Sequence, residues 1–474
     1  MARKISQLRL RSSIRSLSHL NHRSPQTALF AVILKCMSTH QTYSMQLRLC
    51  GRILLLGIFL LFPSITALPY SVQTHEQLID LAWKQSIRPL LLKRYPTLTP
   101  VQVEQAHAFA YGGCAIQDLG YYPFGNPFLS NLTHYVRPGD FVLNLVRNAH
   151  NANELAFAIG ALSHYIGDSI GHSEAINEAV AIEFPKLEKK YGPVVTYDED
   201  EHAHVRTEFA FDVNEISKRR FAPSAYLKHV GLAVPIPLLR RAFFQTYGID
   251  LYQVIGHRRP LLRGYRFAVR SFLPRIAYAE VVLHKSSFPP DTPGEALDKL
   301  NKDLAQSEFE NGWDQYRKKP GIGTHLLAGI IFILPRIGPL SDAAIRGPNQ
   351  QTQQKYVESV NHSTEVLRHI LANFDSIDSM VPNLDLDTGA KVKPGAYRLT
   401  DETYARLVDV LTRNPAQPVP FALRQDIEDY YSNPAAPIST KKNAKKWATL
   451  QARLKQLETM PTTRASLPSP TQAN

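Results

Sequence analysis

The sequence predicts an all-α protein. Apolar residues recur at helical spacing in several segments, and residues 154–171 are apolar around most of their circumference. A half-buried strand alternates between apolar and polar residues, and hardly any stretch of this chain does so for more than a few positions. The apolar fraction of 44% and the charged fraction of 20% are typical of a globular protein with a sizeable core.

Two helices are expected at the start of the folded part. Thr74 is predicted as the N-cap of a helix that runs to about Leu92, because an apolar stripe follows it. Two prolines interrupt that pattern. Thr99 and Pro100 then begin a second helix that continues through Ala108.

A loop and three further helical segments follow. Residues 111–127 are rich in glycine, proline and aromatic residues, and their second half is predicted to be an irregular loop, a setting in which functional residues are common. Helices are expected at 141–148 and 154–171. Residues 198–220 begin with an acidic run and continue as a helix.

The first 67 residues have the composition of a leader. They contain nine of the 54 Lys and Arg residues and no Asp or Glu. Residues 1–44 form a basic N-terminal extension, and residues 45–67 are predicted to be a signal peptide, with an apolar run of ten residues from Ile53 to Phe62 and a small residue, Ala67, at the cleavage position. We therefore expect a secreted or periplasmic protein, which would be membrane-anchored if the leader is not cleaved.

The remaining chain is nearly balanced in charge. Beyond residue 67, 45 basic residues stand against 41 acidic ones, although the whole chain carries +13. No specific nucleic-acid binding is therefore expected. Cys114 is the one cysteine beyond the leader, so that part of the chain can form no internal disulfide.

The C-terminal part shows helical patterns without a second set of chemical residues. Residues 229–432 are predicted to form a helical region, in which 382–400 is a connector. The very apolar segment 326–335 is expected to be a buried core helix, with insertion into a membrane surface as the alternative. Residues 433–474 are predicted to be a Lys-rich helix followed by a disordered tail.

The central apolar helix carries three residues with metal-binding chemistry. His164, Asp168 and His172 are spaced at i, i+4 and i+8, so they form one stripe on a single helix face. Imidazole and carboxylate groups suit Zn²⁺, and a carboxylate in the middle of the stripe can bridge two ions. The alternative is a buried helix with two hydrogen-bonded histidines.

Further residues favour the metal interpretation. His204 and Glu208 form a second i, i+4 pair, whereas His202 faces elsewhere and is a poorer ligand. Three more candidates lie upstream, namely His75, Asp118 and His134. Each residue alone is compatible with a cap, a surface position or an ordinary helix pair. Together they indicate metal binding.

This set resembles the zinc-dependent phospholipase C family over roughly residues 70–215. The shared pattern is an early His, an Asp followed by a His, a helix with His-x3-Asp and then His, and a helix with His-x3-Glu. The resemblance implies a zinc-dependent phospholipase C-like domain over residues 68–228. The same all-helical fold, with a trinuclear zinc site, also serves single-strand-specific zinc nucleases.

The resemblance implies two or three Zn²⁺ ions. One zinc would be bound by Asp118, His134, His164 and Asp168. A second would be bound by His172, His204 and Glu208. Asp168 would bridge to a third, which His75 and the amine and carbonyl of the mature N-terminus would share.

The implied activity is that of an exported phosphodiesterase. It would hydrolyse a phosphoester bond of a phospholipid with a metal-activated water, and Asp118 would act as the base or orient the water. The partners expected are a phospholipid or other phosphodiester substrate, with contact to a membrane surface as a further expectation and no protein partner predicted. The alternatives are a single-strand nuclease on the same fold and a noncatalytic helical metal-binding protein.

Overall fold

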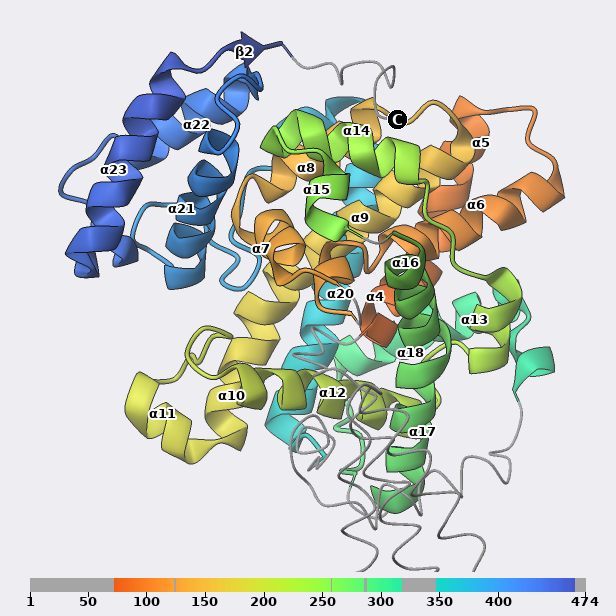
Figure 1. Ribbon diagram of the computed structural model, residues 1–474. Coiled ribbons are helices and arrows are strands. Elements are labelled where there is room, and N and C mark those ends of the chain that lie inside the picture. The colour runs from red at the N-terminus through yellow and green to blue at the C-terminus, as the bar shows by residue number, and fades with distance from the viewer. Residues whose placement is uncertain (1–71, 123–124, 257, 285–287, 318–346, 465–474) are drawn as a thin grey trace, which may run out of the picture. The chain divides into compact units, whose positions relative to one another are not determined.

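Helices provide almost all of the regular structure, which confirms the all-α prediction (Figure 1). The computed structural model describes residues 72–122, 125–256, 258–284, 288–317 and 347–464. The leader, the apolar segment 326–335 and the predicted disordered tail beyond 464 lie outside the described residues. In the described part, two short strands, β1 (Val419–Pro420) and β2 (Thr462–Thr463), pair in parallel.

The first helices differ from the sequence prediction in one detail. Helix α4 (Val72–Ala82) already includes Thr74, so the prediction of Thr74 as an N-cap was wrong. The Thr74 hydroxyl instead donates a hydrogen bond of 2.9 Å to Oδ1 of Asp212. The π-helical turn η1 (Trp83–Ile87) joins α4 to α5 (Arg88–Arg94).

The predicted start of the next helix is confirmed. Helix α6 (Pro100–Gly113) is capped by Thr99, which forms a capping box with Gln102. The helix extends beyond the predicted end at Ala108.

The elements up to residue 255 include the helices expected near 141–148 and 154–171. In chain order they are η2 (Gln117–Gly120), α7 (Pro127–Tyr135), α8 (Pro138–Arg147), α9 (Ala152–Gly171), η3 (His172–Ile176), α10 (Asn177–Glu183), α11 (Pro185–Tyr191), α12 (Glu201–Ser217), α13 (Ser224–Val230), α14 (Ile236–Tyr247) and α15 (Leu251–Ile255).

The later elements are also helical, apart from the two strands. In chain order the helices are α16 (Arg258–Phe267), η4 (Ala268–Phe272), α17 (Leu273–His284), α18 (Glu295–Asn311), η5 (Trp313–Tyr316), α20 (Gln350–Ala372), η7 (Phe374–Ser379), α21 (Arg398–Thr412), α22 (Phe421–Tyr431), η8 (Ser439–Lys442) and α23 (Ala444–Thr459). The predicted connector is irregular between η7 and α21, and the predicted Lys-rich helix is α23.

Helix α9 lies at the centre of the packing (Figure 1), in contact with α4, α6, α8 and α20. Its closest neighbour is α6, because glycines face each other where the two helices meet. A Cβ atom on Gly160 would lie 2.2 Å from the backbone oxygen of Ala110, and one on Gly113 would lie 2.1 Å from that of Phe157. This close packing fixes α9, and with it the stripe of candidate ligands on one of its faces.

The hydrophobic core is shared between the N-terminal and C-terminal parts. Phe157 and Ala161 of α9 belong to the same apolar cluster as Leu407 of α21 and Leu423 of α22. A second cluster joins other α9 side chains to Leu367 of α20. The C-terminal region therefore packs against the helices that carry the candidate ligands.

No helix of the described segments combines the length and the apolarity needed to cross a bilayer.

Candidate metal centre

All eight predicted ligands converge in the interior of the protein. They come from α4 (His75), η2 (Asp118), α7 (His134), α9 (His164 and Asp168), the start of η3 (His172) and α12 (His204 and Glu208). None of these residues is more than 4% exposed. His202, the poorer ligand candidate by its helical position, is exposed. Residues separated by more than a hundred positions thus form one buried polar cluster.

Asp168 is the centre of this cluster. Its Oδ1 lies 3.2 Å from Nε2 of His75 and 3.9 Å from Nε2 of His172. Its Oδ2 lies 3.2 Å from Nε2 of His134 and 2.9 Å from Nε2 of His164. One carboxylate therefore faces four imidazoles, an arrangement that allows it to bridge ions on both of its sides.

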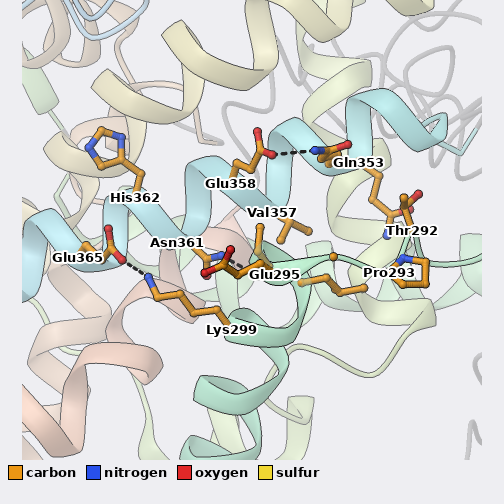
Figure 2. Close-up of a pocket in the computed structure, with 14 residues that line it drawn as sticks. Thr292, Pro293, Glu295, Lys299, Gln353, Val357, Glu358, Asn361, His362 and Glu365 are labelled. Carbon is orange, nitrogen blue, oxygen red and sulfur yellow. Dashed lines mark hydrogen bonds and ion pairs between the residues drawn. The ribbon is translucent and has the colours of Figure 1, made fainter.

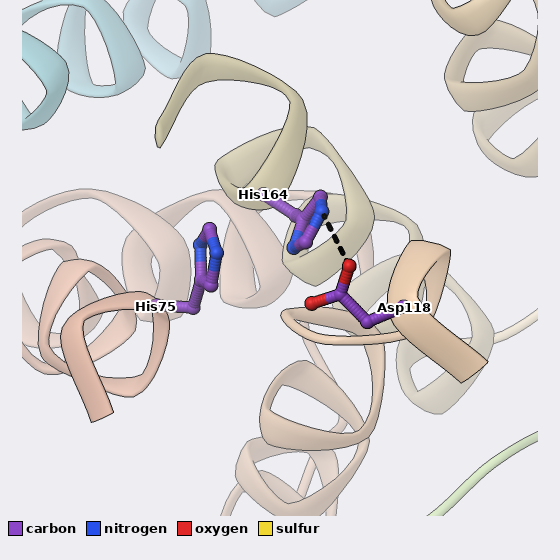
Figure 3. Close-up of side chains that lie close together, drawn as sticks. All are labelled: His75, Asp118 and His164. Carbon is purple, nitrogen blue, oxygen red and sulfur yellow. Dashed lines mark ion pairs between the residues drawn. The ribbon is translucent and has the colours of Figure 1, made fainter. Parts of the chain in front are cut away.

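Asp118 approaches the same group from the turn after α6. Its Oδ1 lies 3.4 Å from Nε2 of His134 and 3.7 Å from Nε2 of His164. Figure 3 shows Asp118 directed at His164, with His75 on the other side of that imidazole. The rings of His75 and His164 are stacked, with their centroids 4.2 Å apart.

The remaining three residues form a group at the other end of the stripe. Oε1 of Glu208 lies 3.0 Å from Nε2 of His172 and 3.1 Å from Nε2 of His204. His172 is the first residue of the π-helical turn η3, and such turns inside helices are frequent at functional sites.

Three hydrogen bonds orient the imidazoles. The Nδ1–H groups donate to backbone carbonyls, that of His134 to Ser130 at 2.8 Å and that of His164 to Cys114 at 3.0 Å. The Nδ1–H of His172 donates to Leu386 at 3.0 Å. Since a carbonyl can only accept, each ring has its proton on Nδ1. The Nε2 atom, which faces the carboxylates, is then the ring nitrogen that can bind a metal once its proton is lost.

The donor set fits zinc in type and spacing. Three groups have ligand atoms within 4.8 Å of one another: His75 with Asp118 and His164, His134 with His164 and Asp168, and His172 with His204 and Glu208. Zinc binds such nitrogen and oxygen atoms at about 2 Å, so ligands around one ion lie a few ångströms apart. The assignment of each residue to a particular ion remains a prediction.

A buried carboxylate without hydrogen bonds also points to a cation. Within the described segments, neither carboxylate oxygen of Asp118 takes part in a hydrogen bond. Its imidazole neighbours lie at 3.4 and 3.7 Å, and a buried carboxylate with so few close contacts would gain a strong interaction from a bound cation.

Burial and neighbouring charges shift the pKa values of the predicted ligands in the metal-free protein. Burial acts to raise the pKa of Asp168, but His164, His172 and the hydrogen bonds it accepts hold that pKa well below its usual range. Burial raises the pKa of Glu208 to about 8 despite its bond to His172, and burial lowers the pKa of His204 to about 4. The pKa of His172 is raised because Asp168 and Glu208 outweigh the opposing effect of burial. The metal-free His172–Glu208 pair therefore keeps a proton that a bound metal would displace.

Sequence reasoning missed the contribution of the connector. Leu386 accepts the Nδ1–H of His172, and Oδ1 of Asp387 lies 3.7 Å from the same nitrogen. The available signal was weak, namely two aspartates and a glycine, Gly389, in a predicted loop.

A surface pocket elsewhere is separate from this cluster. It has a volume of about 490 Å³, lies between α18 and α20, and is lined by none of the eight residues. Figure 2 shows its charged lining, which includes the ion pair between Lys299 and Glu365. Exposed pairs of this kind are common on protein surfaces.

Comparison with known proteins agrees with the geometry. Residues 74–255 match the family model described as zinc dependent phospholipase C. No curated protein and no solved structure matches the chain. The matched segment contains all eight converging residues. The segment 74–255 therefore has the sequence signature of the zinc-dependent phospholipase C family.

Proposed function

We propose that the protein is an exported zinc-dependent phosphodiesterase of the phospholipase C type, which hydrolyses a phosphoester bond of a phospholipid. The observation that carries the proposal is the position of Asp168, whose two oxygens face four imidazole nitrogens at 2.9–3.9 Å. The match of residues 74–255 to the zinc-dependent phospholipase C family supports the same class of reaction.

The charges of the cluster suit a phosphate diester. Three carboxylates, those of Asp118, Asp168 and Glu208, face five imidazoles that bind a metal in their neutral form. Two or three Zn²⁺ ions bound there would leave a net positive charge, would activate a water molecule and would stabilise the negative charge that develops on the phosphate.

Asp118 is the residue best suited to proton transfer. It lies on a short 3-10 helix at the edge of the cluster, and within the described part its oxygens are not engaged in hydrogen bonds. Its carboxylate can orient the attacking water and accept its proton as the oxygen bonds to phosphorus and the bond to the leaving alcohol breaks. Removing such a base costs about 10²–10⁴-fold in rate.

The substrate class follows from charge and from the family. Apart from the leader, 45 basic and 41 acidic residues leave a net charge of only +4, which gives little support for binding a polyanion. A phospholipid substrate, and contact with the membrane surface that holds it, are therefore proposed in preference to single-stranded nucleic acid. Export rests on the leader pattern at 45–67.

The test compares substrates and variants of the full chain. Zinc-loaded protein is incubated with mixed phosphatidylcholine and phosphatidylglycerol vesicles, and in parallel with single-stranded DNA. We expect release of diacylglycerol and phosphorylated head group, and no digestion of the DNA. Asp118→Asn should lose at least 10²-fold in rate, whereas His202→Ala, a change of an exposed histidine on the same helix as His204, should retain wild-type activity.

Two results would redirect the proposal. Digestion of DNA without lipid hydrolysis would favour the nuclease. Zinc binding without hydrolysis of either substrate would favour a noncatalytic metal-binding protein. In contrast, chelator-treated protein that keeps its helical circular dichroism, loses activity and regains it with zinc would exclude the noncatalytic role.

A further inference from the structure

A loop from the C-terminal region lies against the metal centre. Residues 384–391, here called the 384–391 loop, are closed by an antiparallel bridge between Leu384 and Lys391. The backbone N–H of Asp385 also donates to the carbonyl of Ala390 at 2.8 Å. The loop is outside the segment that matches the family, which ends at residue 255.

The backbone of Leu386 contacts two predicted ligands. Its N–H donates to the carbonyl of His134 at 3.2 Å. Its own carbonyl accepts the Nδ1–H of His172 at 3.0 Å. One residue of the loop thus fixes the backbone at one ligand and the ring orientation of another.

Asp387 holds the loop in this position. Its Oδ2 accepts hydrogen bonds from the hydroxyls of Tyr135 at 2.9 Å and Tyr397 at 2.6 Å. Its backbone carbonyl accepts a bond of 2.7 Å from Asn177, in the helix that follows His172. The side chain is buried, and its Oδ1 lies 3.7 Å from Nδ1 of His172.

The loop also packs closely on α9. Gly389 has φ = +67°, and a Cβ atom at this position would lie 2.4 Å from the backbone oxygen of Ser169. A glycine is required here by both the backbone conformation and the close approach. The loop is therefore held against the turn of α9 that follows Asp168.

We propose that Asp387 is a positioning residue of the metal centre, and that it acts through His172. Its carboxylate lies beside the Nδ1–H of His172, and its hydrogen bonds keep the carbonyl of Leu386 in place as acceptor of that N–H. The Nε2 of His172 is thereby kept directed at Glu208 and Asp168. The metal centre formed by the matched segment then needs a residue of the C-terminal region to hold one of its ligands in place. The inference rests on the proposed metal site.

The test measures zinc binding directly. In Asp387→Asn the side chain keeps its size and loses its charge. Loss of such a partner to a metal-binding histidine typically weakens metal affinity 10–100-fold. We expect a loss in this range at one site of the full-length protein, measured by competition with a chromophoric chelator, while the other sites keep their affinity. The visible absorption spectrum of the Co²⁺-substituted protein should change as well.

Asp385→Asn is the matched control. Asp385 is buried in the same loop, but its carboxylate accepts hydrogen bonds from Thr388 and Thr400. We expect this variant to keep the wild-type zinc affinity and Co²⁺ spectrum. A milder variant, Tyr135→Phe, removes one hydrogen bond to Asp387 and should weaken the same site by a smaller factor, even if Asp387→Asn does not fold.

The outcomes separate the inference from the proposed function. Equal affinity in wild type, Asp387→Asn and Tyr135→Phe would overturn the inference, as would equal losses in Asp385→Asn and Asp387→Asn. Wild-type protein that binds zinc without hydrolysing lipid would refute the proposed function alone. Wild-type protein that binds no zinc would refute both.

Discussion

Replacing Asp168 by asparagine tests the centre of the proposed site. The substitution preserves the size of the side chain and one oxygen, but it removes a negative charge that faces four imidazoles at 2.9–3.9 Å. Two unit charges 4 Å apart interact by about 4 kcal/mol at the effective dielectric constant typical of proteins. Zn²⁺ carries twice that charge, so the loss per neighbouring ion should be at least about 4 kcal/mol, which is about 10³-fold in affinity.

The assay is elemental analysis after dialysis, combined with competition against a chelator of known affinity. We expect Asp168→Asn to retain at least one zinc fewer per chain than the wild type and to lose lipid hydrolysis. Asp212→Asn provides the control, because Asp212 is also a buried aspartate but bonds to Thr74 and Gln73 outside the three ligand groups. Wild-type zinc content and affinity in Asp168→Asn would refute the role of this carboxylate.

Three further substitutions test the surrounding structure. Burial raises the pKa of Asp80 to about 8, against the hydrogen bond from Tyr111, so the folded protein keeps a proton that the unfolded chain releases near pH 4. The free energy of unfolding of the metal-free protein should therefore fall as the pH rises from about 4 to 8. Asp80→Asn should reduce this pH dependence in chemical denaturation, and an unchanged dependence would contradict the assignment. Gly389→Ala should lower the melting temperature more than Gly192→Ala. Both glycines have positive φ, but a Cβ atom would meet the backbone of Ser169 at Gly389 and open space at Gly192. Equal shifts in melting temperature would contradict this reasoning. Thr99→Ala should cost about 1 kcal/mol of stability in denaturant titration through loss of the capping box, and no loss would show that the cap does not contribute.

Local sequence patterns predicted much of the fold and of the candidate site. His164 and Asp168 on α9, and His204 and Glu208 on α12, are each one helical turn apart, so spacing alone places them on a common face. The capping box at Thr99 is likewise a local signal.

Long-range packing accounts for what the sequence did not reveal. Leu386 contacts His172 across 214 positions of the chain, and its contribution is made through a backbone carbonyl that no side-chain pattern reports. Thr74 failed as a predicted cap for a related reason. Its hydroxyl bonds to Asp212, 138 positions away, so a tertiary contact and not a helix terminus explains the residue.

Anomalous diffraction from crystals of the zinc-loaded protein, recorded on both sides of the zinc absorption edge, is the most direct test of the central claim. We expect two or three anomalous peaks, each about 2 Å from nitrogen or oxygen atoms of the eight converging residues and one of them beside Asp168. A well-ordered cluster without anomalous peaks, or with zinc bound only elsewhere, would contradict it.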